Sequence, residues 1–215
     1  MTIDGRPGFD VRSELAGWRL FWAGLALEGE ARGIDELRAR AEERARRRFT
    51  LEKLAEDPVV AAIRKLFRAA GCDPTRYRPS SEALLRRVLK GEPLPAIHPF
   101  VDFNNCLSLD LALPACVLAA GAIAPPVVLR AGSAGQSFDS LRGPFYLAGK
   151  PLLADERGPF GTPITDSERV KILPQTTRAL LVVYAPETIE TGAIAAALEE
   201  SARALEGIAI AEASS

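Results

Sequence analysis

The sequence contains a single histidine and only three cysteines among its 215 residues. A Ser–His–Asp or Cys–His hydrolase needs a histidine beside its nucleophile, so His98 is the one candidate for such a base. Pro99 follows His98 directly and biases it away from helix, which favours a packing or surface role. The cysteines are odd in number and lack CxxC spacing, which predicts buried free thiols, no structural zinc and no disulfide scaffold. We expect no metal and no other cofactor.

Long hydrophobic runs and an excess of one charge are missing too. No apolar stretch approaches the roughly 20 residues that a membrane-crossing helix needs, and the N-terminus lacks the order of a signal peptide. The 27 Lys and Arg residues are balanced by 28 Asp and Glu residues, so an affinity for nucleic acid would require a local basic patch. These features predict a cytoplasmic protein with no membrane partner.

The first part of the chain shows helical patterns. Residues 13–30, which include Trp18 and Trp22, carry an apolar stripe that predicts a helix with both tryptophans in the core. Residues 35–50 have acidic and basic neighbours at helical spacing. Further helices are predicted from Asp57 to Gly71 and, capped by Ser80 or Ser81, up to Gly91.

From Pro93 onward the pattern changes to short apolar runs separated by Gly, Pro and Asp, which predict strands and turns. An amphipathic helix capped near Thr191 is predicted over 188–208, and disorder over 211–215. Helices first and strands later indicate an α+β fold with β-sheets flanked by helices. We predict an N-terminal helical extension over 1–56 and a main domain over 57–210.

Two segments concentrate polar side chains beside apolar ones. Asn104 and Asn105 lie in "VDFNN", and their amides could hold a carbonyl, an amine or a water, although asparagine is as common in turns and helix caps. The residues 165–168 place two hydroxyls and two carboxylates together, part of which a capping box would explain. The residues alone indicate a pocket with carboxylates and hydroxyls.

Two other patterns are less specific. The glycine-rich segment 130–138 lacks the P-loop lysine and GxGxxG spacing, so it indicates a hairpin or connecting loop more than a nucleotide site. Basic residues on two consecutive predicted helices could contact nucleic-acid phosphates or form a solvated face. The residues chosen as candidates for this contact are Arg78, Arg86, Arg87 and Lys90.

Taken together, the segments 76–109, 129–143, 153–172 and 180–186 resemble the B3/B4 domain. This domain is the editing module of the phenylalanyl-tRNA synthetase β subunit and also occurs as free-standing proteins, which "RPSSEALLRRVLKG" and "TDSER" resemble most. The resemblance covers residues 57–187. It implies an aminoacylated tRNA 3′ end as partner, no DNA, and hydrolysis of the aminoacyl ester by a positioned water without a dedicated protein base.

The resemblance also implies a set of site residues. The family's Thr–Asn pair corresponds to Asn104 and Asn105, so an asparagine replaces the threonine. In the synthetase, this pocket hydrolyses tyrosine wrongly attached to tRNA(Phe). The family's pocket histidine corresponds to Cys116, which puts the same specificity for tyrosine in question. Its pocket glutamate falls within 165–168, where Asp166 is the favoured inward carboxylate. The catalytic candidates are therefore Asn104, Asn105 and Asp166, and the substrate-binding candidates are Cys116, Gly132, Gly135, Thr165, Ser167 and Glu168.

Three functions remain open on this basis. The leading hypothesis is a free-standing trans-editing factor that deacylates a mischarged aminoacyl-tRNA. The second, motivated by Cys116, is a tRNA- or amino-acid-binding module that has kept the fold without turnover. The third is a hydrolase of small aminoacyl or peptide-like esters, consistent with the lack of overall positive charge.

Overall fold

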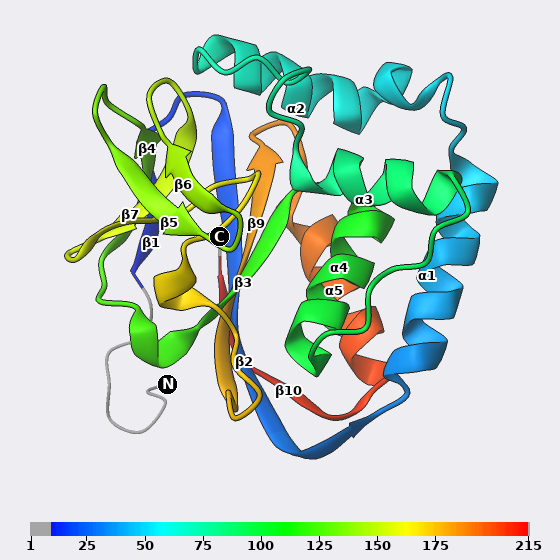
Figure 1. Cartoon of the computed structure of the whole chain (residues 1–215). Coiled ribbons are helices and arrows are strands. Elements are labelled where there is room, and N and C mark those ends of the chain that lie inside the picture. The colour runs from blue at the N-terminus through cyan, green and yellow to red at the C-terminus, as the bar shows by residue number, and fades with distance from the viewer. Residues whose placement is uncertain (1–9, 215) are drawn as a thin grey trace.

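The computed structural model describes residues 10–214, which form two four-stranded sheets, a hairpin and a layer of helices (Figure 1). The strands are β1 (Val11–Ser13), β2 (Trp18–Arg32), β3 (Ala115–Ala119), β4 (Val127–Ala131), β5 (Ser137–Ser140), β6 (Gly143–Tyr146), β7 (Pro151–Asp155), β8 (Gly158–Gly161), β9 (Arg178–Pro186) and β10 (Glu206–Ser214). The α-helices are α1 (Ile34–Arg48), α2 (Pro58–Ala69), α3 (Ser80–Leu89), α4 (Pro99–Leu111) and α5 (Thr191–Arg203). Short 3-10 helices are η1 (Leu54–Glu56), η2 (Ala120–Ala122) and η3 (Glu168–Val170).

The main sheet has the strand order β10-β2-β9-β3 and is antiparallel throughout. Its strand β2 occupies residues for which the apolar stripe predicts a helix, so that prediction is wrong for 13–30. Residues 20–25 are all buried, because helices and strands cover both faces of β2. A strand buried on both faces loses the alternation of apolar and polar residues, and periodicity then cannot distinguish it from a buried helix. Trp18 and Trp22 do lie in the core.

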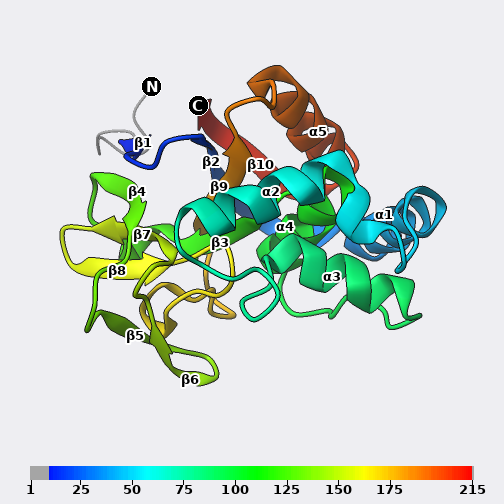
Figure 2. The same ribbon diagram turned by 90° about the horizontal axis from the view of Figure 1, so that it is seen from above.

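The helices α1, α3, α4 and α5 lie on one side of the main sheet and the smaller strands on the other, while α2 runs across one end of the sheet (Figures 1 and 2). The helices α1, α2, α3 and α5 confirm the predicted ones, although no side chain caps α3, so Ser80 and Ser81 are not its caps. Helix α4 lies where strands and turns are predicted. His98 is its N-cap, in extended backbone, and its Nδ1 accepts from the backbone N–H of Phe100 at 3.2 Å.

The second sheet has the order β1-β4-β7-β8, and the β5–β6 hairpin packs against it around Phe138, Leu147 and Leu152. The glycine-rich segment 130–138 joins β4 to β5, which confirms the connecting loop. Gly132 sits there against the chain's own backbone, since a Cβ at this position would come 2.0 Å from the carbonyl oxygen of Leu147. The tight fit of two backbones therefore explains this glycine.

The two ends of the described chain both contribute to the sheets. Strand β10 pairs with β2, so the predicted disorder from residue 211 is wrong as far as Ser214. In the predicted extension, 1–56, only α1 and the short η1 are helical among the described residues; β1 and β2 join sheets formed with later strands. The boundary at residue 56 stays a prediction. No helix within 10–214 combines the length and apolar character needed to cross a membrane.

The close approach at Gly132 predicts a strong effect of a single added methyl group. Gly132→Ala should lower the free energy of unfolding by about 2–3 kcal/mol, because the Cβ would force the β4–β5 loop away from Leu147. Gly121→Ala, where nothing lies within 4 Å of the added Cβ, should change it by less than about 0.5 kcal/mol. Urea denaturation of both variants measures the difference, and equal midpoints would contradict the tight fit.

Candidate functional site

Asp166 lies in a tight turn that follows β8. The Thr162 hydroxyl organises this turn: it donates to the carbonyl of Thr165 at 2.7 Å and accepts from the N–H groups of Ile164 and Thr165. Asp166 then pairs with Gly161 in an isolated bridge. A Cβ on Gly161 would lie 3.0 Å from the Asp166 carboxyl oxygen Oδ1, so the glycine leaves room for this side chain to fold inward.

Asp166 is half-buried, and one oxygen of its carboxyl is buried without a partner. Its Oδ1 is inaccessible to solvent and has no hydrogen-bond partner among the described residues. Burial raises the pKa of Asp166 to about 7, and a backbone hydrogen bond from Thr162 only partly opposes that rise. Such a group changes its charge near neutral pH and has an unused acceptor directed into the protein.

Tyr184 and Cys116 lie beside this carboxyl. The Tyr184 hydroxyl, from β9, is 3.5 Å from the Cys116 sulfur, from β3, and 3.7 Å from the Cβ position above Gly161. Burial raises the pKa of the Cys116 thiol well above its usual value, and the Asp166 charge raises it further. The pKa of Tyr184 is raised by burial and by the neighbouring Cys116 and Asp166. We call Asp166, Tyr184 and Cys116 the acid cluster.

Both asparagines lie in the middle of α4, so neither caps a helix nor forms a turn. Asn104 is buried, and its Nδ2 donates to Asn105 Oδ1 at 3.4 Å. The Asn104 Oδ1 is a buried acceptor with no partner among the described residues, like Asp166 Oδ1. Helix α4 packs against β3, the strand that carries Cys116. A common pocket for the asparagines and Asp166 stays a prediction.

The remaining substrate-binding candidates have structural partners or face solvent. Ser167 begins η3 and its hydroxyl accepts from the N–H of Arg169. Glu168 is exposed and forms an ion pair with Lys171 at 2.6 Å, so Asp166 is the buried carboxylate of the two. Thr165 uses its backbone in the turn described above. Gly135 has φ +80° and open space around it, as a turn requires.

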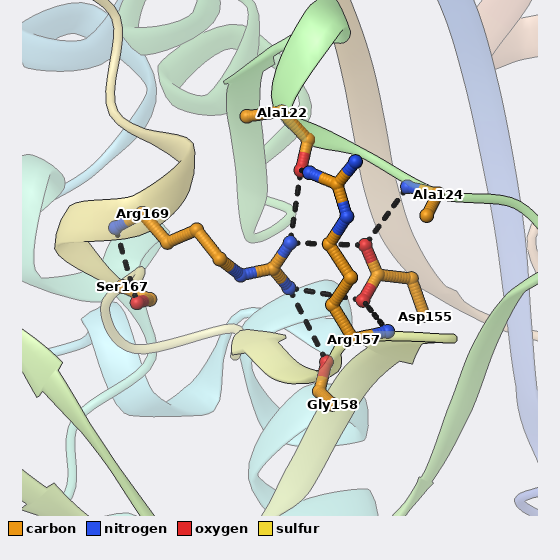
Figure 3. A network of polar contacts seen from close by, with 7 residues as sticks. All are labelled: Ala122, Ala124, Asp155, Arg157, Gly158, Ser167 and Arg169. Atoms are coloured by element: carbon orange, nitrogen blue, oxygen red, sulfur yellow. Dashed lines mark hydrogen bonds and ion pairs between the residues drawn. The ribbon is translucent and has the colours of Figure 1, made fainter.

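An ion pair that sequence reasoning missed anchors the turn (Figure 3). Arg169 donates to both carboxylate oxygens of Asp155, at 3.0 and 3.1 Å, and to the carbonyls of Ala122 and Gly158. Asp155 is fully buried and also accepts from the N–H groups of Ala124 and Arg157. The aspartate that ends the apolar run of β7 and the arginine of "TDSER" were the available sequence signals.

The tRNA-binding candidates on and beside α3 differ in their partners. Arg78 and Arg86 are ion-paired with the buried Glu82. Arg87 pairs with Glu92 and donates to the carbonyl of Pro93, while Lys90 is exposed at the end of the helix. Arg64 of α2, which is not among the candidates, shares the same Glu82.

A cavity of about 460 Å³ lies elsewhere, between α1, α4 and α5, and contains none of the predicted site residues in its lining. Its walls include Leu37, Phe49, Leu109 and the paired Arg44 and Asp110. Within residues 10–214 no three His, Cys, Asp or Glu side chains are grouped closely enough to hold a metal ion.

The fold and site define an α+β protein in which carboxyl, thiol and phenol groups from the main sheet and the turn after β8 lie together. Residues 62–206 match the B3/4 domain family, which is most of the chain, and the protein therefore belongs to that family. The resemblance found in the sequence is confirmed.

One solved structure gives a distant comparison. It is the crystal structure of an N-terminal fragment of the phenylalanyl-tRNA synthetase beta-subunit from Pyrococcus horikoshii, with 12% sequence identity and a TM-score of 0.48. The match covers 93% of this chain and 52% of that one, so the protein spans about half of the fragment. No curated protein matches the sequence.

The raised pKa of Asp166 predicts a dependence of stability on pH. Between its ordinary value of 3.8 and about 7, the unfolded chain has lost this proton while the folded chain retains it. The free energy of unfolding should therefore fall as pH rises through this window, by at most about 4 kcal/mol. Asp166→Asn, which cannot ionise, should remove that part of the slope. Urea denaturation at several pH values tests this, and parallel curves for both proteins would contradict it.

The buried ion pair predicts that the turn depends on Asp155. Asp155→Ala should lower the free energy of unfolding by about 3–5 kcal/mol, since it leaves Arg169 and two backbone donors without their acceptor. Glu168→Ala removes an exposed partner of Lys171 and should cost less than about 1 kcal/mol. Thermal or chemical denaturation distinguishes them; similar losses in both would show that the buried pair has no special role.

Proposed function

We propose that this protein hydrolyses the ester bond of a mischarged aminoacyl-tRNA. The family supports a module related to tRNA synthetases. The observation that carries the proposal is the Asp166 carboxyl oxygen, buried without a partner beside two neutral polar side chains. Buried polar groups are rarely left unpaired, so such an acceptor suits a ligand that brings its own donors.

The α-ammonium group of an esterified amino acid offers three N–H donors and a positive charge. Ionised Asp166 accepts hydrogen bonds from this group. The positive charge of the bound ammonium group in turn favours the ionised form of Asp166. Tyr184 and Cys116 are buried beside it, and their raised pKa values keep both side chains neutral. A charge-assisted hydrogen bond of this kind contributes about 1.5–3 kcal/mol.

The reaction itself is addition of water to the ester carbonyl. The C–O bond to the terminal ribose breaks, which releases a free amino acid and a tRNA with its 3′ hydroxyl restored. The amides of Asn104 and Asn105 orient the water and the carbonyl, and orientation alone can lower such a barrier by several kcal/mol. A covalent route through Cys116 is disfavoured, because its raised pKa keeps it a thiol and only the thiolate is a strong nucleophile.

One observation favours the alternative of a binding module without turnover. No residue of the acid cluster is a histidine, and the one histidine of the chain caps α4 through its Nδ1. Such a module would bind aminoacyl-tRNA and protect or deliver it. Rates of ester loss separate the two functions, since a binding module would leave them at the spontaneous value or below it.

The test is a panel of mischarged aminoacyl-tRNAs incubated with the purified protein. At least one pair should lose its ester faster than the uncatalysed rate, and the rate should rise with pH through about 7 as Asp166 ionises. Asp166→Asn should lower kcat/KM for that substrate by about 10- to 100-fold, and Asn104→Ala or Asn105→Ala by about tenfold.

His98→Ala is the matched control, because it removes a helix cap and leaves the acid cluster intact. It should keep kcat/KM within about twofold while lowering stability by about 1 kcal/mol. Binding without acceleration across the whole panel would support the alternative, and loss of activity in the His98 variant alone would overturn the assignment of the site.

A further inference from the structure

Three arginines converge on one buried carboxylate in the helical layer. Glu82 of α3 is 1% exposed, and Arg64 of α2 donates to both of its oxygens, at 2.8 and 3.1 Å. Arg86 donates its Nε to the same carboxylate at 2.9 Å, and the Nε of Arg78 lies 3.5 Å from it. We call Arg64, Arg78 and Arg86 the arginine triad.

The triad carries more positive charge than its partner can neutralise. Among residues 10–214 every ion pair of these arginines is made to Glu82, so three cations share one anion. Their side chains keep 15%, 42% and 30% of their surface exposed. Each guanidinium has five N–H donors. Arg64 also donates to the Thr75 hydroxyl at 3.4 Å, so the donors available to an outside anion come mainly from the more exposed Arg78 and Arg86. A buried carboxylate thus holds a doubly positive surface in a fixed arrangement.

The triad adjoins the turn that carries Asp166. The backbone N–H of Ser80, between Arg78 and Glu82, donates to the carbonyl of Pro163 at 2.9 Å. Pro163 lies in the turn that positions Asp166. A polymer lying on the triad would therefore pass close to the acid cluster.

The neighbouring aromatic ring distinguishes nucleic acid from an acidic protein as the occupant. Tyr77 precedes Arg78, and its half-buried ring contacts two cations: the exposed Arg76, with Cζ 5.2 Å from the centroid, and the buried Lys150, with Nζ at 3.9 Å. Alternation of cations with an aromatic ring is typical of surfaces that bind single-stranded nucleic acid through phosphates and bases together.

We infer that the arginine triad, held in place by Glu82, binds phosphates near the 3′ end of tRNA and so leads the ester toward Asp166. This inference rests on the proposed function for the identity of the RNA. It assigns Arg64 to the interface beside Arg78 and Arg86, and it leaves Arg87, which is engaged by Glu92 and Pro93, outside it.

The test is the binding of uncharged tRNA, which has no ester, as a function of salt. Arg78→Gln combined with Arg86→Gln should weaken binding about tenfold at 0.1 M salt and reduce the slope of log K against log salt by about 1.5. The matched control is Arg47→Gln with Arg203→Gln, which removes the same charge from exposed pairs on α1 and α5. Equal weakening in both double variants, or none in either, would overturn the inference.

Glu82→Gln tests whether placement of the arginines matters more than their charge. This variant makes the surface one unit more positive, so charge alone predicts tighter tRNA binding. Loss of the organising carboxylate predicts weaker binding, by about threefold or more, in protein whose circular dichroism matches the wild type. Tighter binding would overturn the positioning role of Glu82. Should this variant not fold, the double arginine variant still decides the phosphate contact.

Failure of the proposed function has a different signature. Hydrolysis of a 3′-aminoacyl adenosine, which has no phosphates, should be unaffected by the triad variants and lowered by Asp166→Asn. A wild-type protein that binds tRNA through the triad but hydrolyses no ester would refute the proposed function alone. If the protein hydrolyses the adenosine ester and its triad variants bind tRNA as tightly as the wild type, only the inference that the triad binds tRNA phosphates is refuted.

Discussion

The candidate site depends on the buried pair between Asp155 and Arg169. Each oxygen of Asp155 accepts one guanidinium N–H and one backbone N–H, so the carboxylate has lost its water but none of its hydrogen bonds. The Nη1 and Nη2 groups of Arg169 also donate to the backbone carbonyls of Ala122 and Gly158. Such complete pairing is what makes a charge tolerable inside a protein. The pair holds η3 against the end of β7. Because Asp166 lies two residues before η3, the pair also limits where Asp166 can lie.

Asp155 and Asp166 differ in how far their carboxyl groups are hydrogen-bonded. Asp155 ends β7, and Asp166 follows β8, the next strand of the same sheet. Asp155 is saturated with donors, whereas Asp166 retains an oxygen with none, and its pKa rises to about 7 for lack of compensation. An unsatisfied buried acceptor costs stability, so its presence calls for an explanation outside the folded chain. In the proposed function, the α-ammonium group of the substrate supplies the missing donor.

The sequence predicted the parts of this fold that local physics determines. Helix α2 follows a capping aspartate and a proline, and Asp57 does accept from two N–H groups of its first turn. The prediction failed where burial removed the periodic signal, as in β2, and where a helix is buried on nearly all sides, as in α4 with Phe100, Phe103 and Asn104. The resemblance limited the pocket carboxylate to 165–168 and left the register open, with Asp166 favoured; in the structure Asp166 has the buried oxygen and Glu168 is exposed. Tyr184 acquires its role from Cys116, 68 residues away in the chain, and Glu82 shares its carboxylate with Arg64 of the preceding helix as well as with its own neighbours Arg78 and Arg86. Sequence reasoning did not foresee either grouping.

Glu82 shows how a buried acid can serve a basic surface. A patch of arginines on a flexible surface loses side-chain freedom when it binds a phosphate, and that loss reduces affinity. Three guanidiniums already fixed on one carboxylate have lost much of that freedom during folding, while their charges still exceed the single negative one. The balanced composition of the whole chain therefore says little about nucleic-acid binding. What the proposal requires is that positive charge is concentrated on and beside α3, which donates through Ser80 to the turn that carries Asp166.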